Sequence, residues 1–569
     1  MNYFAVLPAI NGLFGLALTS AHLEQVTDRT LGDLLVSPLA DLLLLAIAAI
    51  ALIALTLQLS ATVVMVNRQQ TGRALTFSGI AVDTARAIRR VMHHQSAVLV
   101  VYLFVLAPLG GLGLFSVITR GVSIPPFVTR EFMKTTAGGL GYMAVIGILM
   151  YLNLRLIHTL PLMFVGGRRP FRALVDSVRA TRRRFWRTLL LIAVPVAAGV
   201  LMTTALCEAL IGVTDAVSRV WPDAAGVVGS VSISAGHTIG FFLTGAVTVV
   251  VAQLLVADCR EFLGLAPIEL GVQIASKSRR AKATLVGARV AVASVILASG
   301  VAAAPVRAAD EPASVDTVVL AHRGYSGGGV ENTIAALDAA AKLHPDYVET
   351  DMQETKDGRF VASHDTNLLM VAGLNENIYD MTVDRVTKVV ETEGGFTGTI
   401  PTMTDYVKRA AKLGVPLLIE LKVHGHESPD YIDRFLAELD AAGVTDQNIY
   451  HSLSPEAVRG LKERRPELRV GYTIAMSIGA VPQLDCDFYV IEQASFNTGF
   501  LADAHAEGKP VYVWTVNDPV TIRKLMRDRV DGIVTDIPNV AEESRTQFDR
   551  TDETALHVAD ALSYLDALR

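Results

Sequence analysis

The sequence predicts an α-helical transmembrane bundle followed by a (β/α)₈ barrel, and three observations lead to that fold class. Of the 569 residues, 51% are hydrophobic, and the mean hydropathy is positive at +0.41. Nearly all of the long apolar runs lie within residues 1–305. From residue 316 onward, short apolar strands alternate with helical stretches, a pattern typical of a parallel sheet. The chain therefore combines a membrane half with a globular half.

Charge and cysteine content narrow the functional classes. The net charge of −6 is small for this length and gives no indication of a nucleic-acid partner. The three cysteines, Cys207, Cys259 and Cys486, are too few for a disulfide framework or a Cys-based zinc site. The length favours about two to four domains. We expect a multi-span membrane domain over 1–305, a barrel over 317–542 and a helical tail over 543–569.

Apolar stretches long enough to cross a bilayer, roughly 20 residues each, recur through the first half. They lie at about 3–20, 39–66, 96–119, 138–165, 187–213, 230–257 and 285–304. The loops 67–95, 166–186 and 258–284 are rich in Arg and Lys, whereas the loops 21–38, 120–137 and 214–229 are not. Basic loops stay in the cytoplasm, so the sequence predicts a multi-pass membrane protein whose residues after 305 lie outside the cell.

Residues 277–310 also have the layout of a secretory signal, with a basic start, an apolar run and a small-residue end. Cleavage there would free the C-terminal half. We expect an uncleaved anchor, because an internal segment of this kind more often remains as a span. Both interpretations place the C-terminal half on the same side of the membrane.

The sequence pattern of the second half predicts nine strands and six helices. The strands are expected at 318–322, 347–352, 360–364, 417–422, 448–451, 469–473, 487–491, 511–516 and 532–535. The helices are expected at 333–343, 403–413, 430–442, 454–465, 499–507 and 519–529. Eight repeats close a barrel, and the ninth strand is expected as an extra hairpin arm around residues 356–358. The alternative is an open doubly wound sheet, but no Gly-rich dinucleotide loop follows the first strand.

Polar side chains gather where these strands end, which is the edge that carries the active site in barrels. They are His322, Arg323, Glu349, Asp351, His364, Asp365, Glu420, Lys422, Trp514, Asn517 and Asp536. Alternate spacing places Glu349 with Asp351, and Glu420 with Lys422, on one strand face. Three carboxylates from two strands suit Mg²⁺ or Ca²⁺. A salt-bridge network with the two cations is the alternative.

The other polar groups suit phosphate chemistry. A histidine can move a proton near neutral pH, and two histidines at strand ends beside acids are more than an isolated core histidine would require. Arg323 follows the first strand and precedes a glycine, and an arginine can grip two phosphate oxygens at once. These residues predict a site for a phosphate-containing ligand.

Eight short motifs follow one another in the second half. They are His-Arg-Gly at 322–324, Glu-Asn-Thr at 331–333, Glu-Thr-Asp-Met-Gln-Glu-Thr-Lys-Asp-Gly at 349–358, His-Asp at 364–365, Ile-Pro-Thr at 400–402, Ile-Glu-Leu-Lys at 419–422, Trp-Thr-Val-Asn at 514–517 and Asp-Gly-Ile-Val-Thr-Asp-Ile-Pro at 531–538. In this order they resemble the glycerophosphodiester phosphodiesterase family, over residues 317–542. The whole chain resembles the membrane-integral members, in which a multi-span domain precedes an extracytoplasmic barrel. One departure is Val330, where the family usually has Pro before Glu-Asn-Thr, and this loosens the preceding glycine-rich loop.

The resemblance implies a function and a role for each strand-end residue. The implied function is metal-dependent hydrolysis of a glycerophosphodiester or lysolipid to glycerol 3-phosphate and an alcohol, with Ca²⁺ or Mg²⁺ as cofactor. The implied roles are acid–base catalysis for His322 and His364, metal binding for Glu349, Asp351 and Glu420, phosphate binding for Arg323 and Lys422, and a pocket wall for Trp514. Two alternatives remain: a related barrel phospholipase or lyase that forms a cyclic phosphate, and a non-enzymatic ligand-binding membrane protein.

Overall fold

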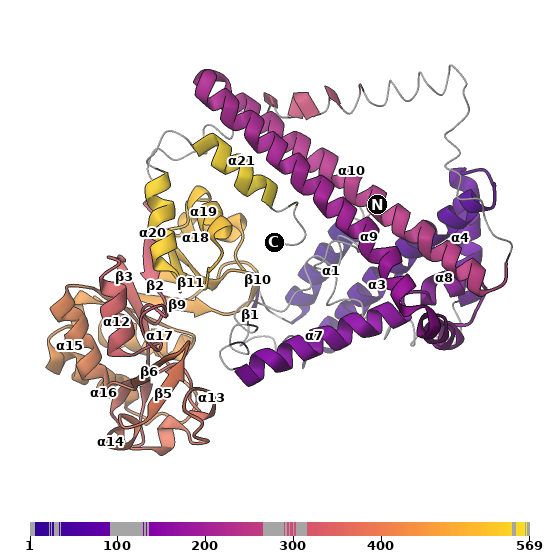
Figure 1. Cartoon of the computed structure of the whole chain (residues 1–569). Helices are drawn as coiled ribbons and strands as arrows, with labels where there is room; N and C mark the ends of the chain where they lie inside the picture. Colours follow the sequence, from indigo (N-terminus) through magenta and orange to yellow (C-terminus); the bar gives the residue numbers. More distant parts are fainter. Residues whose placement is uncertain are drawn as a thin grey trace.

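A computed structural model describes most of the two halves of the chain (Figure 1). The described residues are 6–91, 136–265, 316–548 and 553–565, except 22, 24, 28–33, 35 and 564, together with single positions at 129 and 133 and within 290–302. The expected span 96–119 lies outside them, as does most of the expected span 285–304. The signal-like segment 277–310 falls almost entirely outside them too.

The N-terminal half is helical. Its helices are α1 (Leu7–Ser20), α3 (Pro38–Gln70), α4 (Phe77–Val91), α7 (Thr136–Leu156), α8 (Thr159–Phe164), α9 (Pro170–Val220) and α10 (Pro222–Phe262). Four helical stretches are long and apolar enough to cross a membrane: Pro38–Gln70, Ala137–Phe164, Pro170–Val220 and Pro222–Phe262. They contain the expected spans 39–66, 187–213 and 230–257 and nearly all of 138–165. The expected span 3–20 corresponds to α1, which has only 14 residues.

The Arg-rich ends of these helices meet at one end of the bundle. Arg260 donates to Asn67 (3.2 Å) and links the ends of α10 and α3. His158, just before α8, lies 2.9 Å from Asp258 of α10, and both side chains are buried. Helices α9 and α10 are joined at Trp221, at the opposite end of the bundle from these charges. This opposite end is the one that contacts the second half of the chain.

The second half contains a closed barrel of eight parallel strands. They are β2 (Val318–Ala321), β3 (Tyr347–Glu354), β7 (Leu417–Leu421), β8 (Ile449–Ser452), β9 (Val470–Ile474), β11 (Phe488–Glu492), β12 (Val511–Trp514) and β13 (Gly532–Thr535). Each strand pairs in parallel with its neighbours, and β2 pairs with both β13 and β3 to close the ring. The ninth strand, β4 (Phe360–Ala362), pairs antiparallel with the end of β3. This confirms the barrel and the extra hairpin arm.

Seven described helices cover the outside of the barrel; six are the expected ones, and the last, at 538–547, is additional. They are α12 (Ile334–Ala341), α15 (Met403–Leu413), α16 (Tyr431–Ala442), α17 (Pro455–Arg464), α18 (Thr498–Ala506), α19 (Pro519–Arg527) and α20 (Pro538–Gln547). The sequence marks their starts, because Thr402, Ser454 and Asn497 each cap a helix with a side-chain oxygen. A short strand, β10 (Ser477–Gly479), and no helix, occupies the described connection between β9 and β11.

An insertion between β4 and α15 covers part of the carboxyl ends of the strands. It contains α13 (Leu369–Ala372), a 3₁₀ turn η4 (Ile378–Asp380), α14 (Val383–Val386), β5 (Val390–Glu393) and β6 (Phe396–Thr399). Tyr379 of η4 stacks on His426, in the loop after β7, with ring centroids 4.1 Å apart. The carboxylate of Glu393 accepts the backbone amide of Glu331, in the loop after β2. These contacts hold the insertion at the rim of the barrel.

The C-terminal tail forms the end of α20 and a further helix, α21 (Glu553–Ser563). The sequence left open whether this tail packs on the barrel or on a partner. Val558 and Leu562 are buried against Ile233 of α10, and Leu210 of α9 packs against the same cluster. Figure 1 shows α21 alongside α9 and α10. On its other side, Asp560 pairs with two arginines of α19, so α21 lies between the barrel and the membrane helices.

Candidate active site

The interior of the barrel has an apolar layer beneath a charged one. Leu320, Leu418, Val490 and Val534 belong to one buried cluster inside the strands. Because successive side chains of a strand point to opposite faces, Glu420 lies on the same face as Leu418, one step nearer the carboxyl end. In the parallel register, Glu420 is opposite Asp351 and Leu418 is opposite Glu349. Glu349, Asp351 and Glu420 therefore face the barrel interior. The alternate spacing had predicted that Glu349 and Asp351 share one strand face.

His322 directly follows β2 and is held by a carboxylate. Its Nδ1 lies 2.8 Å from Oδ1 of Asp536, which follows β13, the neighbouring strand. Asn517 in turn donates to Asp536. The Nε2 atom lies 3.9 Å from Glu349. The His322 ring is buried and has a fixed orientation, with Nδ1 toward Asp536 and Nε2 toward the acidic pair.

Arg323 is placed by a left-handed backbone conformation, with φ of 54°. Its backbone amide donates to Glu349 (3.0 Å), and its guanidinium donates to both carboxylate oxygens of Glu331. The guanidinium Nε also lies 3.2 Å from Asp351. A buried cation of this kind requires opposite charges close by, and the carboxylates supply them.

Asp351 is the most enclosed acid of the site. Lys422 lies 3.0 Å from one of its oxygens, and Asn332 donates to the other at 2.8 Å. Burial alone would raise the pKa of Asp351, but the charges of Lys422 and Arg323 outweigh it and hold the pKa well below its usual range. Burial alone would lower the pKa of Lys422, and Asp351 and Glu420 raise it instead. Asp351 is therefore ionised beside two cations.

His364 follows β4 and is also oriented by a carboxylate. Its Nδ1 lies 2.8 Å from Oδ1 of Asp365. Gln353 of β3 donates to the backbone carbonyl of His364 and fixes the strand end. Burial lowers the pKa of His364, and the charges of Arg323 and Lys422 lower it further. The ring is consequently neutral near pH 7 and able to accept a proton.

A buried triad of Glu349, Glu420 and His451 has the geometry of a metal site. One ligand atom from each lies within 4.8 Å of the others. Nε2 of His451 is buried and has no hydrogen-bond partner among the described residues, while Oε1 of Glu420 is buried and lies 3.2 Å from Nζ of Lys422. A buried imidazole nitrogen without a partner, beside two carboxylates, fits a divalent cation. Among the expected metal ligands, Glu349 and Glu420 thus lie together, whereas Asp351 contacts the two cations.

The sequence analysis missed His451. It lies on β8, and its Nδ1 is 2.6 Å from the hydroxyl of Thr473 on β9. That contact directs Nε2 toward Glu349, 3.7 Å away. The rule that selected the other residues, a polar side chain at the carboxyl end of a strand, would also have selected this one, because β8 ends at Ser452. The expected strand 448–451 ends at this histidine, so the rule applies to it directly.

Trp514 lies at the boundary between the two layers. It packs against the apolar interior cluster, and its indole N–H donates to the carbonyl of Val490 at 3.2 Å. The ring is only partly buried, so it forms part of the floor beneath the charged groups. This position fits the expected pocket wall.

The glycine-rich loop before Glu331 is set by close packing. A Cβ on Gly328 would lie 2.3 Å from Cβ of Ala339, and one on Gly329 would lie 2.6 Å from the backbone nitrogen of Ala336. Glycine therefore allows the loop to approach α12. Although Val330 replaces the family's usual proline, the loop still delivers Asn332 to Asp351.

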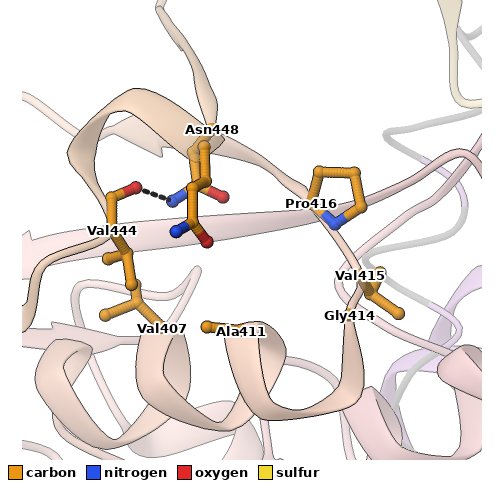
Figure 2. A pocket seen from close by; sticks show the side chains of 8 residues that line it. Val407, Ala411, Gly414, Val415, Pro416, Val444 and Asn448 are labelled. Carbon is orange, nitrogen blue, oxygen red and sulfur yellow. Dashed lines mark hydrogen bonds between the residues drawn. The ribbon is translucent and has the colours of Figure 1, made fainter.

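A separate cavity of about 160 Å³ lies at the opposite end of the barrel (Figure 2). Pro416 and Asn448, which line it, directly precede β7 and β8, so the cavity is at the amino ends of the strands. Asn448 donates to Val444 and accepts from Leu417, so its amide is fully used within the fold. Barrels carry stabilising contacts rather than chemistry at this end.

Comparison with protein-family models assigns both halves. Residues 1–298 match the membrane domain of glycerophosphoryl diester phosphodiesterase, and residues 322–540 match the glycerophosphoryl diester phosphodiesterase family. The chain belongs to this family. The resemblance of the motifs is thereby confirmed, and the protein is a hydrolase of glycerophosphodiesters.

Individual relatives cover the catalytic half of this family member. The Bacillus subtilis (strain 168) protein YhdW is 31% identical over 235 residues, which are 39% of this chain and 95% of that protein. A glycerophosphodiester phosphodiesterase of Caldanaerobacter subterraneus is 27% identical over 39% of this chain and 95% of its own length. A solved Oleispira antarctica phosphodiesterase in complex with the product sn-glycerol-3-phosphate is 26% identical, covers 42% of this chain and 98% of its own, and has a TM-score of 0.37. Four long apolar helices and the membrane-domain match indicate that the phosphodiesterase is membrane-associated.

The lowered pKa of His364 gives a direct test of the electrostatics. When a chelator has removed metal ions, we expect the pKa of the His364 ring to be lower than that of an ordinary histidine, because burial and two cations disfavour the imidazolium. Lys422→Met removes one cation, so the pKa of His364 rises. The measurement is ring NMR of the detergent-solubilised protein, with His364→Gln for assignment and the exposed Lys356→Met as the control. A His364 pKa that is unchanged by Lys422→Met would refute the arrangement.

Proposed function

We propose that the barrel uses a divalent metal to hydrolyse glycerophosphodiesters to glycerol 3-phosphate and an alcohol on the extracytoplasmic face of a multi-pass membrane protein. One observation carries the proposal. Two carboxylate-held histidines, two cations and a buried Glu–Glu–His triad converge at the carboxyl ends of one barrel. Hydrolysis of a phosphodiester requires such a set: charge neutralisation on the phosphate oxygens, removal of a proton from the attacking water and delivery of a proton to the leaving alcohol oxygen.

His322 and His364 are proposed as the acid–base pair. In each ring Nδ1 lies beside a carboxylate, Asp536 or Asp365, so proton transfer runs through Nε2. His364, whose ring is neutral at pH 7, can accept the proton of the attacking oxygen. The other ring then donates a proton to the alcohol as it leaves. The carboxylate at Nδ1 stabilises each ring while it carries the extra proton.

Arg323 and Lys422 are proposed to bind the phosphate. Arg323 spans Glu331 and Asp351, and Lys422 lies between Asp351 and Glu420. An ammonium group has three N–H donors, and the guanidinium has five. Both groups are thus fixed by carboxylates at the carboxyl ends of the strands, where their positive charge would face a phosphate. Trp514 is proposed as the wall beneath the glycerol.

The metal is proposed to be held by Glu349 and Glu420, with His451 or Asp351 completing the set. A Ca²⁺ or Mg²⁺ ion bound there would neutralise charge on the phosphodiester. Oxygen ligands suit either ion, while an imidazole ligand is more usual for Zn²⁺. His451 was not in the ligand set that the resemblance implied, so the two sets make different predictions.

Replacing either catalytic histidine is expected to stop turnover rather than binding. For His322→Ala or His364→Ala we expect kcat to fall by about 10²- to 10⁴-fold, with a smaller change in KM, because each ring acts in proton transfer. The measurement is release of glycerol 3-phosphate from glycerophosphocholine by the full-length protein. His344→Ala removes an exposed histidine and serves as the matched control.

Three outcomes would contradict these roles. Unchanged kcat in both histidine variants would remove them from the reaction. A cyclic phosphate that persists after long incubation would favour a lyase. A folded wild-type protein that binds glycerophosphocholine but never turns it over would favour ligand binding alone.

The ligand set is tested by metal binding itself. Glu420→Gln and His451→Gln are each expected to weaken the binding of added Mn²⁺ or Ca²⁺ by at least about tenfold, since even outer partners of a metal site contribute that much. Calorimetric titration of the solubilised protein measures this, with His344→Gln as control. Wild-type affinity in His451→Gln combined with loss in Asp351→Asn would establish the three-carboxylate set instead.

The proposed placement rests on the two ends of the helical bundle. The Arg-rich ends of α3, α8 and α10 meet at one end, and basic segments remain in the cytoplasm. The barrel contacts the other end, through β10 and α21. We therefore propose a membrane domain over 1–305, an extracytoplasmic barrel over 317–542, and a tail over 543–569 that links them.

Cysteine labelling tests this placement. In a Cys486→Ser background, Lys408→Cys on the outside of the barrel is expected to react with an impermeant maleimide in intact spheroplasts. Arg73→Cys, in the basic segment after α3, is expected to react only after permeabilisation. The reverse pattern of labelling would contradict an extracytoplasmic barrel.

A further inference from the structure

The rim of the barrel around the site carries an apolar surface. Within residues 316–548, the large hydrophobic side chains that are exposed are Leu369, Met370, Val390, Phe396 and Ile478. All five belong to the insertion or to β10. Both segments lie at the carboxyl ends of the strands, so exposed apolar side chains occur beside the site and not on the helical flank of the barrel. We call these five residues the apolar rim.

The rim is joined to the membrane helices by a strand. Residues Gln25–Thr27, in the connection between α1 and α3, form β1 and pair antiparallel with β10. Val26 is opposite Ile478 in that pairing. On its other side, β10 is fixed to the loop after β11, because the amide of Ser477 donates to Ser495. Figure 1 shows β1 and β10 between the barrel and the membrane helices.

One rim-side residue enters the membrane domain. Met476 directly precedes β10 and packs against the cluster of Ala17, Leu18, Leu34 and Ala40, which belongs to α1, α3 and their connection. Methionine adapts well to such a gap between helices. The barrel mouth is thus seated against the outer ends of α1 and α3.

A second anchor restrains the barrel on another side. Leu562 of α21 packs at Gly236 of α10, where any Cβ would lie 2.2 Å from its methyl group. Asp560, on the same helix, pairs with Arg523 and Arg527 of α19. With one anchor at β10 and another at α21, the barrel is held at two points on the same ends of the membrane helices. Of the two anchors, the one at β10 lies at the carboxyl ends of the strands, beside the barrel mouth.

We propose that the apolar rim rests on the bilayer and that the site takes acyl-bearing glycerophosphodiesters directly from it. This inference rests on the proposed function. Ile478 of the rim lies on β10, which pairs with β1 and follows Met476, a residue packed on membrane helices. This adjacency is the reason to assign the lipid surface as the occupant of the rim. The reaction itself is unchanged: water adds to phosphorus, the P–O bond to the alcohol breaks, and the alcohol leaves with a proton. The acyl chain stays in the bilayer, on the glycerol 3-phosphate product.

The test compares two substrates on one preparation. Full-length protein in vesicles of phosphatidylcholine and phosphatidylglycerol receives either lysophosphatidylcholine within the bilayer or glycerophosphocholine in solution. The double variant Met370→Glu and Val390→Glu places two charges on the rim. We expect its kcat/KM on the bilayer substrate to fall about tenfold or more, because anionic side chains are repelled by an anionic surface. Gln447→Glu, which adds a negative charge at the amino ends of the strands, away from the rim, is the control.

The soluble substrate separates this inference from the proposed function. If the rim variant cleaves glycerophosphocholine as the wild type does and loses only the bilayer substrate, the inference stands. Equal effects on both substrates, or no effect on either, would overturn it, as would a rim variant that changed only the oligomeric state. Failure of the wild type to cleave glycerophosphocholine would instead count against the proposed function.

Discussion

Charge compensation inside the barrel is the constraint on which the site depends. Asp351 and Glu420 are opposite one another on adjacent strands, directly above an apolar layer, where unpaired carboxylates would be costly. Lys422 lies between them, and Arg323 closes the network from the neighbouring strand. Burial and the same two cations lower the pKa of His364, and these cations are the groups proposed to bind the phosphate. The charges that stabilise the barrel interior are therefore the same ones that form the proposed site.

The basic residues and the barrel contacts lie at opposite ends of the membrane helices. The arginines of the membrane domain gather at one end of its helices, and the barrel is held at the other end by β10 and α21. Neither anchor involves the strand-end residues directly, yet both determine which way the strand ends face. A membrane domain of several helices is more than a tether requires. Two separate docking points give those additional helices a role in orienting the barrel.

The parts that could be predicted from sequence are those with a local signal. Strand-end polar residues, alternate spacing and turn chemistry located the barrel, the hairpin arm and most of the site. His451 ends the expected strand 448–451 and satisfies the same strand-end rule, but none of the eight motifs that carry the family resemblance includes it. The pairing of Val26 with Ile478 had no signal at all, since three residues from a loop meet three residues about 450 positions later. The sequence predicts a helical tail over 543–569, but a local pattern cannot show that Val558 and Leu562 meet α9 and α10 while Asp560 meets α19.

The most direct test of hydrolysis at this site is the fate of water oxygen. Full-length protein would turn over glycerophosphocholine in H₂¹⁸O, and ³¹P NMR would follow the isotope shift of the product. The account predicts one ¹⁸O on the phosphorus of glycerol 3-phosphate and none in the choline, with the label absent from products when His322 or His364 is replaced. Label in the alcohol, or an accumulating cyclic phosphate, would contradict it.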